Sequence, residues 1–247
     1  MKIAIISDIH GNMDALQAVL EDIKLEGCEK IFALGDYAMA GPEPSCTVDW
    51  FFKKQFDDNF KLIQGNTDAM IADYSEELYF TLKEKAPIMA EALKNDAKIL
   101  NSIQKDFLKS LPAQTEIAIE GVKILLVHGS PRKNNEDISP NLKLEDVESM
   151  LENVTADLIL CGHTHLPCGY QTTKKQTVIN VGSVGRPFTP DPKPCYLKLT
   201  IIDGKCLFEH RFVNYDNQKT ANKLKKRDFT GADKLAEMLL NPTVRHF

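Results

Sequence analysis

Seven residues with metal-binding side chains stand where short apolar segments of this chain end. They are Asp8, His10, Asp36, Asn66, His128, His163 and His165. Carboxylate oxygens and imidazole nitrogens are common ligands of divalent ions, and an amide oxygen can complete such a set. In an open α/β sheet, ligands gather in the crevice beyond the carboxyl ends of the strands. We therefore expect the seven side chains to converge and to form a two-metal hydrolytic centre.

The spacing of these residues suits that chemistry. Asp8 and His10 are two residues apart, which places both side chains on one face of an extended segment. His163 and His165 have the same spacing. Asp36 follows a glycine, which allows close backbone approach. Its carboxylate has two oxygens, which can bridge two cations about 3.5–4 Å apart.

The charge of such a centre favours an anionic substrate. Two divalent ions carry four positive charges, whereas Asp8, Asp36 and a bridging hydroxide carry three negative ones, so a positive charge remains for a phosphoryl group. The ions lower the pKa of a bridging water from 15.7 towards about 7. Mixed nitrogen and oxygen ligands without thiolate indicate Mn or Fe as the two divalent ions, with Zn, Co or Ni as alternatives, rather than Ca.

The elements that must position these residues alternate between strand and helix. Short aliphatic runs bounded by Gly, Asp or Ser predict buried strands at 2–6, 30–34, 60–63, 122–127 and 157–161. Apolar residues at helical spacing predict helices at about 13–26 and 46–57. This order is typical of an α/β fold.

The pattern changes after the third strand. Residues 69–112 are rich in Ala, Leu, Glu and Lys, and we expect a helical insert of two or three helices, interrupted by Pro87 and closed by Pro112, beside the metal crevice. Strand 115–119 follows, and a helix is expected near 143–152. Segments 176–181, 195–202 and 205–213 are expected as sequential antiparallel strands, and 215–247 as a helical tail.

Composition limits the class of protein. Over 247 residues the net charge is −5, with 43% apolar and 26% charged residues, which makes a nucleic-acid partner unlikely and fits a globular enzyme with a small phosphorylated substrate. The six Cys form no C-x-x-C pair, as expected of a reducing compartment. The first apolar run is too short for a signal peptide or a membrane span. We expect a cytoplasmic protein without a membrane partner, and the C-terminal strands or tail are compatible with a homodimer.

The motifs resemble, in order, those of the calcineurin-like metallophosphoesterases, especially the small bacterial and archaeal phosphodiesterase-like branch. The matching stretches are Asp8-x-His10, Gly35-Asp36, Gly65-Asn66-x-Asp68, His128-Gly129, Gly162-His163-x-His165 and 180–187. The resemblance implies a four-layer αββα sandwich, in which two mixed sheets pack face to face between helices. It implies a metallophosphoesterase domain at 1–214, with the insert and tail outside its motifs.

The resemblance also implies roles for the seven ligands. Asp36 bridges two metal positions, and Asp36, Asn66 and His128 are expected to be catalytic through the metals. The first position takes Asp8, His10 and His165, and the second takes Asn66, His128 and His163. A hydroxide that bridges the metals would attack phosphorus in a phosphodiester or a nucleotide-like phosphoanhydride.

One position departs from the family pattern. The family usually has a His after the Asn of its third motif, where it binds phosphate and protonates the leaving group, but here the residue is Thr67. Threonine is no general acid near neutral pH, so we expect slow reaction of substrates with poor leaving groups. A protein Ser/Thr phosphatase is the alternative that this residue disfavours. A non-catalytic scaffold is the other alternative, but no ligand is missing here.

Four residues are candidates for substrate contacts: Asn12, Thr67, Arg132 and Arg186. Asn12 is equally suited to be a helix N-cap. Each Arg can clamp a phosphate with two hydrogen bonds or can anchor its own loop. Asp68 can orient a neighbouring group or cap a turn.

Overall fold

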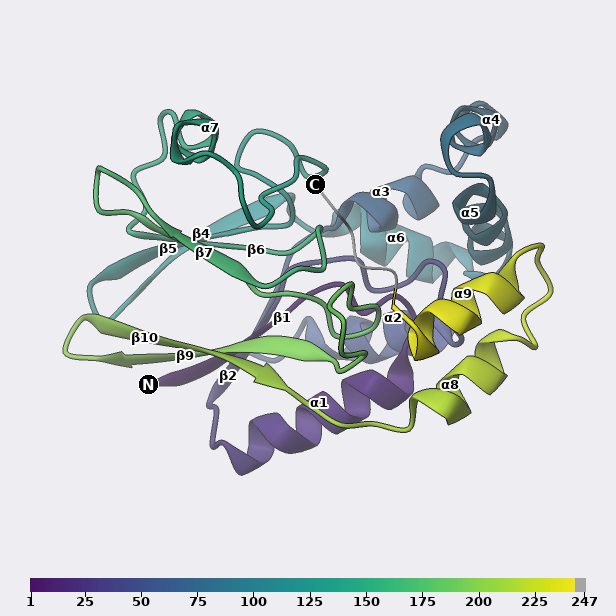
Figure 1. Cartoon of the computed structure of the whole chain (residues 1–247), viewed down its shortest axis with the longest axis horizontal. Coiled ribbons are helices and arrows are strands. Elements are labelled where there is room, and N and C mark those ends of the chain that lie inside the picture. Colours follow the sequence, from purple (N-terminus) through teal and green to yellow (C-terminus); the bar gives the residue numbers. More distant parts are fainter. Residues whose placement is uncertain (243–247) are drawn as a thin grey trace.

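Two five-stranded mixed β-sheets packed face to face form the centre of the molecule, as the computed structural model shows for residues 1–242. Figure 1 shows the sheets as two layers, with α7 (Leu144–Met150) outside one and α1 (Met13–Leu25) outside the other. The predicted four-layer α/β architecture is confirmed. Among the described residues, no helix has both the length and the apolar composition that crossing a bilayer requires.

The first sheet carries the N-terminal half of the expected ligands. Its strands in spatial order are β10 (Lys205–Phe212), β9 (Cys195–Ile202), β1 (Lys2–Ile6), β2 (Lys30–Ala33) and β3 (Phe60–Leu62). Strands β1, β2 and β3 are parallel, so their carboxyl ends meet at one edge. Helix α2 (Pro44–Lys54) lies between β2 and β3 along the chain, and the predicted hairpin of β9 and β10 is present.

The second sheet carries the other three ligands. Its strands in spatial order are β4 (Gln114–Ile119), β5 (Val122–Val127), β6 (Leu158–Cys161), β8 (Thr177–Asn180) and β7 (Cys168–Gln171). The expectation that 176–181 continues as an antiparallel neighbour of 195–202 is wrong, because β8 pairs in parallel with β6 while β9 pairs with β1 in the other sheet. Strand β7, which has only four residues, was not predicted.

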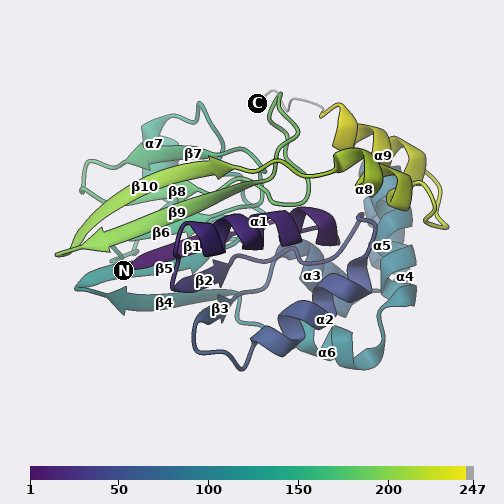
Figure 2. The same ribbon diagram turned by 90° about the horizontal axis from the view of Figure 1, so that it is seen from below.

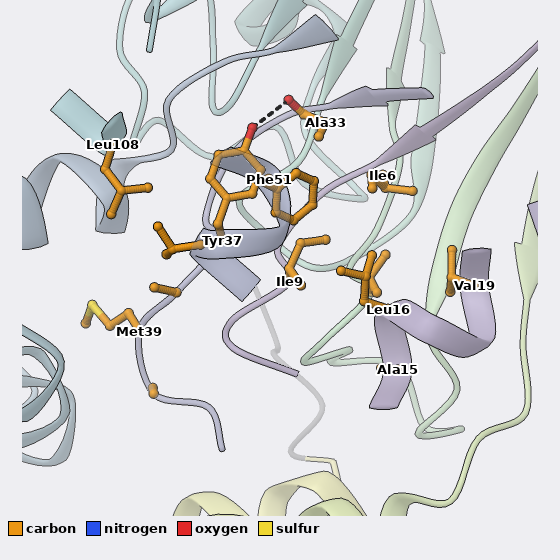
Figure 3. Close-up of a cluster of buried hydrophobic side chains, with 14 of the residues drawn as sticks. Ile6, Ile9, Ala15, Leu16, Val19, Ala33, Tyr37, Met39, Phe51 and Leu108 are labelled. Carbon is orange, nitrogen blue, oxygen red and sulfur yellow. Dashed lines mark hydrogen bonds between the residues drawn. The ribbon is translucent and has the colours of Figure 1, made fainter. Parts of the chain in front are cut away.

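Both faces of the central strands β1, β2, β5, β6 and β8 are buried, which explains their apolar runs. In β1, Ile3 and Ile5 face the core between the two sheets, whereas Ala4 and Ile6 face the helices outside. Figure 3 shows part of this outer core, where the Tyr37 hydroxyl donates a hydrogen bond to the carbonyl of Ala33 at 3.1 Å. Packing on both faces thus fixes the orientation of these strands and the place where each of them ends.

The insert contains four helices rather than two or three. They are α3 (Asn66–Ala72), α4 (Glu76–Lys85), α5 (Pro87–Ile99) and α6 (Ser102–Ser110). Pro87 separates α4 from α5 as expected, but α6 begins after a capping box of Asn101 and Gln104 that the prediction missed. The first helix starts at the expected ligand Asn66 itself.

The tail forms two helices that pack beside the insert. They are α8 (Asn217–Leu224) and α9 (Ala232–Leu240), and Figures 1 and 2 both show α9 next to α5 at one end of the sandwich, while α8 packs against α9 and α1. Residues 243–247 of the predicted tail lie outside the described residues. Arg227 links the tail to the insert, because its Nη2 lies 2.5 Å from Oδ1 of Asp96. The other oxygen of Asp96 accepts a hydrogen bond from the backbone N–H of Ala40, next to the metal crevice.

Replacing Arg227 by Met should destabilise the whole fold. The Asp96 side chain is fully buried and that of Arg227 is 9% exposed, so the substitution leaves a buried carboxylate unpaired. We expect the free energy of unfolding to fall by about 3–5 kcal/mol, measured by urea denaturation. Lys109→Ala, which removes an exposed ion pair with Asp73, is the control and should have little effect. Equal stability of the Arg227 variant and the wild type would contradict this account.

Candidate metal centre

The seven expected ligands lie where the carboxyl ends of the two sheets meet. Sheet one supplies four of them after β1, β2 and β3, and sheet two supplies three after β5 and β6. Five of the seven have a left-handed backbone: Asp8 (φ 56°), His10 (48°), Asp36 (57°), His163 (69°) and His165 (62°). Non-glycine residues in this region are strained and cluster at functional sites. The turns therefore hold these side chains in place at an energetic cost.

Asp8, His10 and His165 form the first compact group. Nε2 of His10 lies 3.1 Å from Nε2 of His165, and Oδ1 of Asp8 lies 3.2 Å from the latter nitrogen. All three side chains are buried. Oδ1 of Asp8 is also without a hydrogen-bond donor among residues 1–242, although it is buried. An orphaned buried carboxylate oxygen is costly unless a cation neutralises it.

The histidine tautomers support a cation at this point. Nδ1 of His10 lies 3.0 Å from the carbonyl of Met39, and Nδ1 of His165 lies 2.5 Å from the carbonyl of Arg186. Because a carbonyl only accepts, each Nδ1 carries a proton, and the neutral form of each ring presents its Nε2 lone pair to the group. In these neutral forms the two lone pairs face each other beside a carboxylate, and a divalent ion relieves the resulting repulsion. The residues therefore fit the metal that the sequence predicts.

The second group contains Asp8, Asp36 and His128. Nδ1 of His128 lies 2.7 Å from the carbonyl of Leu34, so its Nε2 also faces inward. Oδ2 of Asp36 lies 3.4 Å from Nε2 of His128 and 3.7 Å from Nε2 of His10. This oxygen thus stands between the two groups, and Oδ1 of Asp8, which belongs to both groups, lies 3.8 Å from Nε2 of His10 and 3.9 Å from Nε2 of His128.

Asn66 and His163 lie beside this second group. Oδ1 of Asn66 lies 3.0 Å from Nε2 of His128. The ring of His163 meets that of His128 edge to face at 5.3 Å between centroids, and its backbone N–H donates to Oδ2 of Asp8 at 3.0 Å. The structure thus brings all seven sequence-predicted ligands to one place.

Electrostatics makes the pocket strongly attractive to cations. Burial alone raises the pKa of Asp8, but the neighbouring His165 lowers it and the result is about 2. Burial also opposes ionisation of Asp36, yet His128 holds its pKa well below the usual range. Burial lowers the pKa of His128, whereas Asp36 raises it, and the result is about 10. Two ionised carboxylates thus share one buried site, where the protonated His128 or a bound cation supplies the compensating positive charge.

Asp68 fixes the backbone that carries Asp36. Its buried carboxylate accepts hydrogen bonds from the N–H groups of Asp36 at 2.8 Å, Tyr37 at 3.0 Å and Gly65 at 2.9 Å. The two roles considered for Asp68 are therefore combined, because it caps α3 through Gly65 and orients Asp36. Burial followed by repulsion from Asp36 raises the pKa of Asp68 to about 7.

Two of the four residues predicted to contact substrate, Asn12 and Arg132, have structural roles instead. Asn12 caps α1 by accepting from the N–H of Ala15 at 3.0 Å, and its amide donates to the carbonyl of Gly185. Its side chain is 1% exposed, so the capping alternative holds. Arg132 pairs with Glu136 at 2.6 Å within its own loop, which corresponds to the anchoring alternative.

The other two predicted substrate-contact residues, Thr67 and Arg186, lie next to the metal ligands. Thr67 is 6% exposed, and its hydroxyl is buried with no partner among residues 1–242, but its backbone N–H donates to Oδ1 of Asp36 at 2.9 Å. Arg186 is half-buried and lines a small cavity together with His10. Its Nη1 lies 3.3 Å from the sulfur of Met89 in α5, so the insert contacts this edge of the centre.

Sequence reasoning missed Asp137 and assigned no role to Asn180, although Asn180 begins the matching stretch 180–187. Oδ1 of Asp137 lies 3.2 Å from Nε2 of His163. Asn180, the last residue of β8, donates to the carbonyl of Gly162 at 2.7 Å. Asp137 follows no predicted strand, so the rule that found the ligands could not find it. A polar residue directly after the apolar run of β8 was the available signal for Asn180.

Comparison with known proteins identifies the family. The model of the calcineurin-like phosphoesterase superfamily domain matches residues 1–204. An uncharacterized protein of Methanocaldococcus jannaschii is 32% identical over 238 residues, which cover 91% of this chain and 92% of that protein. The chain belongs to the calcineurin-like phosphoesterase superfamily, as the motifs predicted. Membership supports a hydrolase, and it implies divalent metal ions.

Solved structures agree on the fold. The crystal structure of a hypothetical protein from Pyrococcus horikoshii has a TM-score of 0.85 at 23% identity and covers 96% of this chain and 97% of that one. The crystal structure of a metallophosphoesterase from Sphaerobacter thermophilus has a TM-score of 0.77 at 24% identity and covers 98% of both chains. Both likenesses extend past residue 204 and so include the architecture of the tail.

Replacing Gly65 by Ala should disrupt the centre locally. A Cβ at this position would lie far inside van der Waals contact of Oδ1 and the backbone N of Asp36. We expect loss of bound Mn²⁺, measured by metal analysis after dialysis, while far-UV circular dichroism stays unchanged. Gly169→Ala is the control, because the added Cβ would meet the flexible end of the Ile179 side chain and no atom of a ligand residue. Full metal content in the Gly65 variant would contradict the geometry.

Proposed function

We propose that this protein is a dinuclear metal-dependent phosphoesterase that hydrolyses phosphodiesters or nucleotide-like phosphoanhydrides. The observation that carries the proposal is the position of Oδ2 of Asp36, between the Nε2 atoms of His10 and His128. When bound, two divalent ions supply an activated water as the nucleophile and positive charge for the phosphoryl oxygens. Mn or Fe is our preferred assignment for both ions.

The residues divide between the two ions around this shared oxygen. Asp8, His10 and His165 would hold the first ion, since they form one buried group. Asn66, His128 and His163 would hold the second. Carbonyl groups fix the tautomers of the three imidazoles that face inward, so little reorganisation accompanies binding. The imidazole nitrogens are thereby already directed at the positions that the ions would occupy.

The leaving group is the main limit on the substrate. The Thr67 hydroxyl is buried and cannot donate a proton to a leaving alkoxide near neutral pH. Substrates whose leaving groups are stable anions should therefore react faster than alkyl phosphomonoesters. This property favours activated phosphodiesters and phosphoanhydrides over the phosphoserine or phosphothreonine of a protein.

Arg186 is the one predicted substrate contact that we retain as a phosphate-binding residue. Burial, followed by His165, lowers the pKa of His10 to about 4, and the positive charge of Arg186 adds to this shift. Its guanidinium carbon lies 5.6 Å from the centroid of the Phe188 ring, and Phe188 stacks on the ring of His165, so the charge stands beside the centre. An arginine beside the metals can bind a phosphoryl oxygen with charge-assisted hydrogen bonds.

Replacing Asp36 or His128 by Ala tests the mechanism. We expect kcat/KM for an aryl phosphodiester with added Mn²⁺ to fall by at least about 100-fold, because each residue is placed to hold the second ion. Asp191→Ala, an exposed carboxylate paired with Lys193, is the control and should retain full activity. Undiminished turnover in the Asp36 variant would refute the mechanism. A phosphopeptide that reacts faster than the aryl diester would instead favour the protein phosphatase.

A further inference from the structure

Asp137 is a carboxylate beside the metal centre that is not among the seven ligands. Its Oδ1 lies 3.2 Å from Nε2 of His163. The Asp137 side chain is 43% exposed, whereas that of His163 is 17% exposed. It reaches the histidine from the loop between β5 and α7, so the two residues come from different turns of the chain.

The loop around Asp137 is anchored on both sides. The preceding residue, Glu136, pairs with Arg132 at 2.6 Å. The following residue, Ile138, is 1% exposed in the core beneath α7, and its carbonyl accepts from Nδ2 of Asn180 at 3.0 Å. Because Glu136 and Ile138 are both held by the fold, the exposed carboxylate of Asp137 between them has a defined position.

The same asparagine anchors the turn that carries His163. Nδ2 of Asn180 also lies 2.7 Å from the carbonyl of Gly162 and 2.9 Å from Oγ1 of Thr164. One buried amide thus holds the residue after Asp137 and both neighbours of His163. The distance between the carboxylate and the imidazole is therefore a property of the fold and not of two independent surface side chains.

We propose that Asp137 is a positioning residue, which orients His163 for the second metal ion. The carboxylate accepts a hydrogen bond from the Nε2–H of His163, and this selects the tautomer whose Nδ1 lone pair can bind a cation. A carboxylate partner also makes the imidazole a more basic ligand. This inference rests on the proposed function, because it assigns His163 to the second of two metal positions.

The test is a metal titration of the full-length protein. Chelator-treated wild type, titrated with Mn²⁺ in a calorimeter, should bind two ions. In Asp137→Ala we expect about 10–100-fold weaker binding at one site and unchanged binding at the other. Asp137→Glu should recover part of the lost affinity. Asp57→Ala removes a carboxylate that is 37% exposed and precedes the amino end of β3, opposite the ligands, and this variant should bind as the wild type does.

The outcomes separate this inference from the proposed function. Two ions in the wild type and unchanged affinities in Asp137→Ala would refute the role of Asp137 and leave the dinuclear centre standing. Fewer than two ions in the wild type would refute the dinuclear centre and the inference with it. Equal weakening of both sites with a lower melting temperature would show a merely structural role.

A spectroscopic signature checks the tautomer directly. In the Zn²⁺-loaded protein, long-range ¹H–¹⁵N NMR of the imidazoles should show the His163 proton on Nε2. A His163 proton on Nδ1 would overturn the proposal, because Asp137 faces Nε2.

Discussion

The gathering of two buried carboxylates and three inward-facing imidazole Nε2 atoms is the constraint on which the rest of the structure depends. Asp8 and Asp36 are both ionised and both buried, and three histidines turn Nε2 towards them because carbonyl groups hold their Nδ1 protons. Such a group is unfavourable in a protein interior without compensating positive charge. Divalent ions supply that charge, so the feature that destabilises the metal-free site also gives it affinity.

The fold holds this group together by several independent means. Parallel strands of two sheets end at one edge, and left-handed turns after them aim five of the ligands inward. Asp68, in α3 of the insert, accepts a hydrogen bond from the backbone N–H of Asp36 and fixes its position. Arg227 of the tail and Asp96 of the insert brace the loop after Asp36 through Ala40. The insert and the tail thus support the centre, although neither supplies more than one of its expected ligands.

The strands and ligands could be predicted because their causes are local. A short apolar run predicts a strand that is buried on both faces, and a polar residue at its end is a candidate ligand. His128 after β5 is an example. The partner of β8 could not be predicted, since sheet membership depends on contacts across the whole chain. The role of Asp137 was missed for the same reason, because only the tertiary fold brings it to His163. The sequence is equally compatible with phosphate binding and with loop anchoring for Arg132, and only the tertiary structure shows that its guanidinium pairs with Glu136.

The most direct test of the central claim is a crystal structure of the Mn²⁺-soaked protein with anomalous data at the manganese edge. The account predicts two anomalous peaks about 3.5–4 Å apart, with the Asp36 carboxylate in contact with both. The ligands of the first ion should be Asp8, His10 and His165. A single peak, or two peaks that do not share Asp36, would contradict the account.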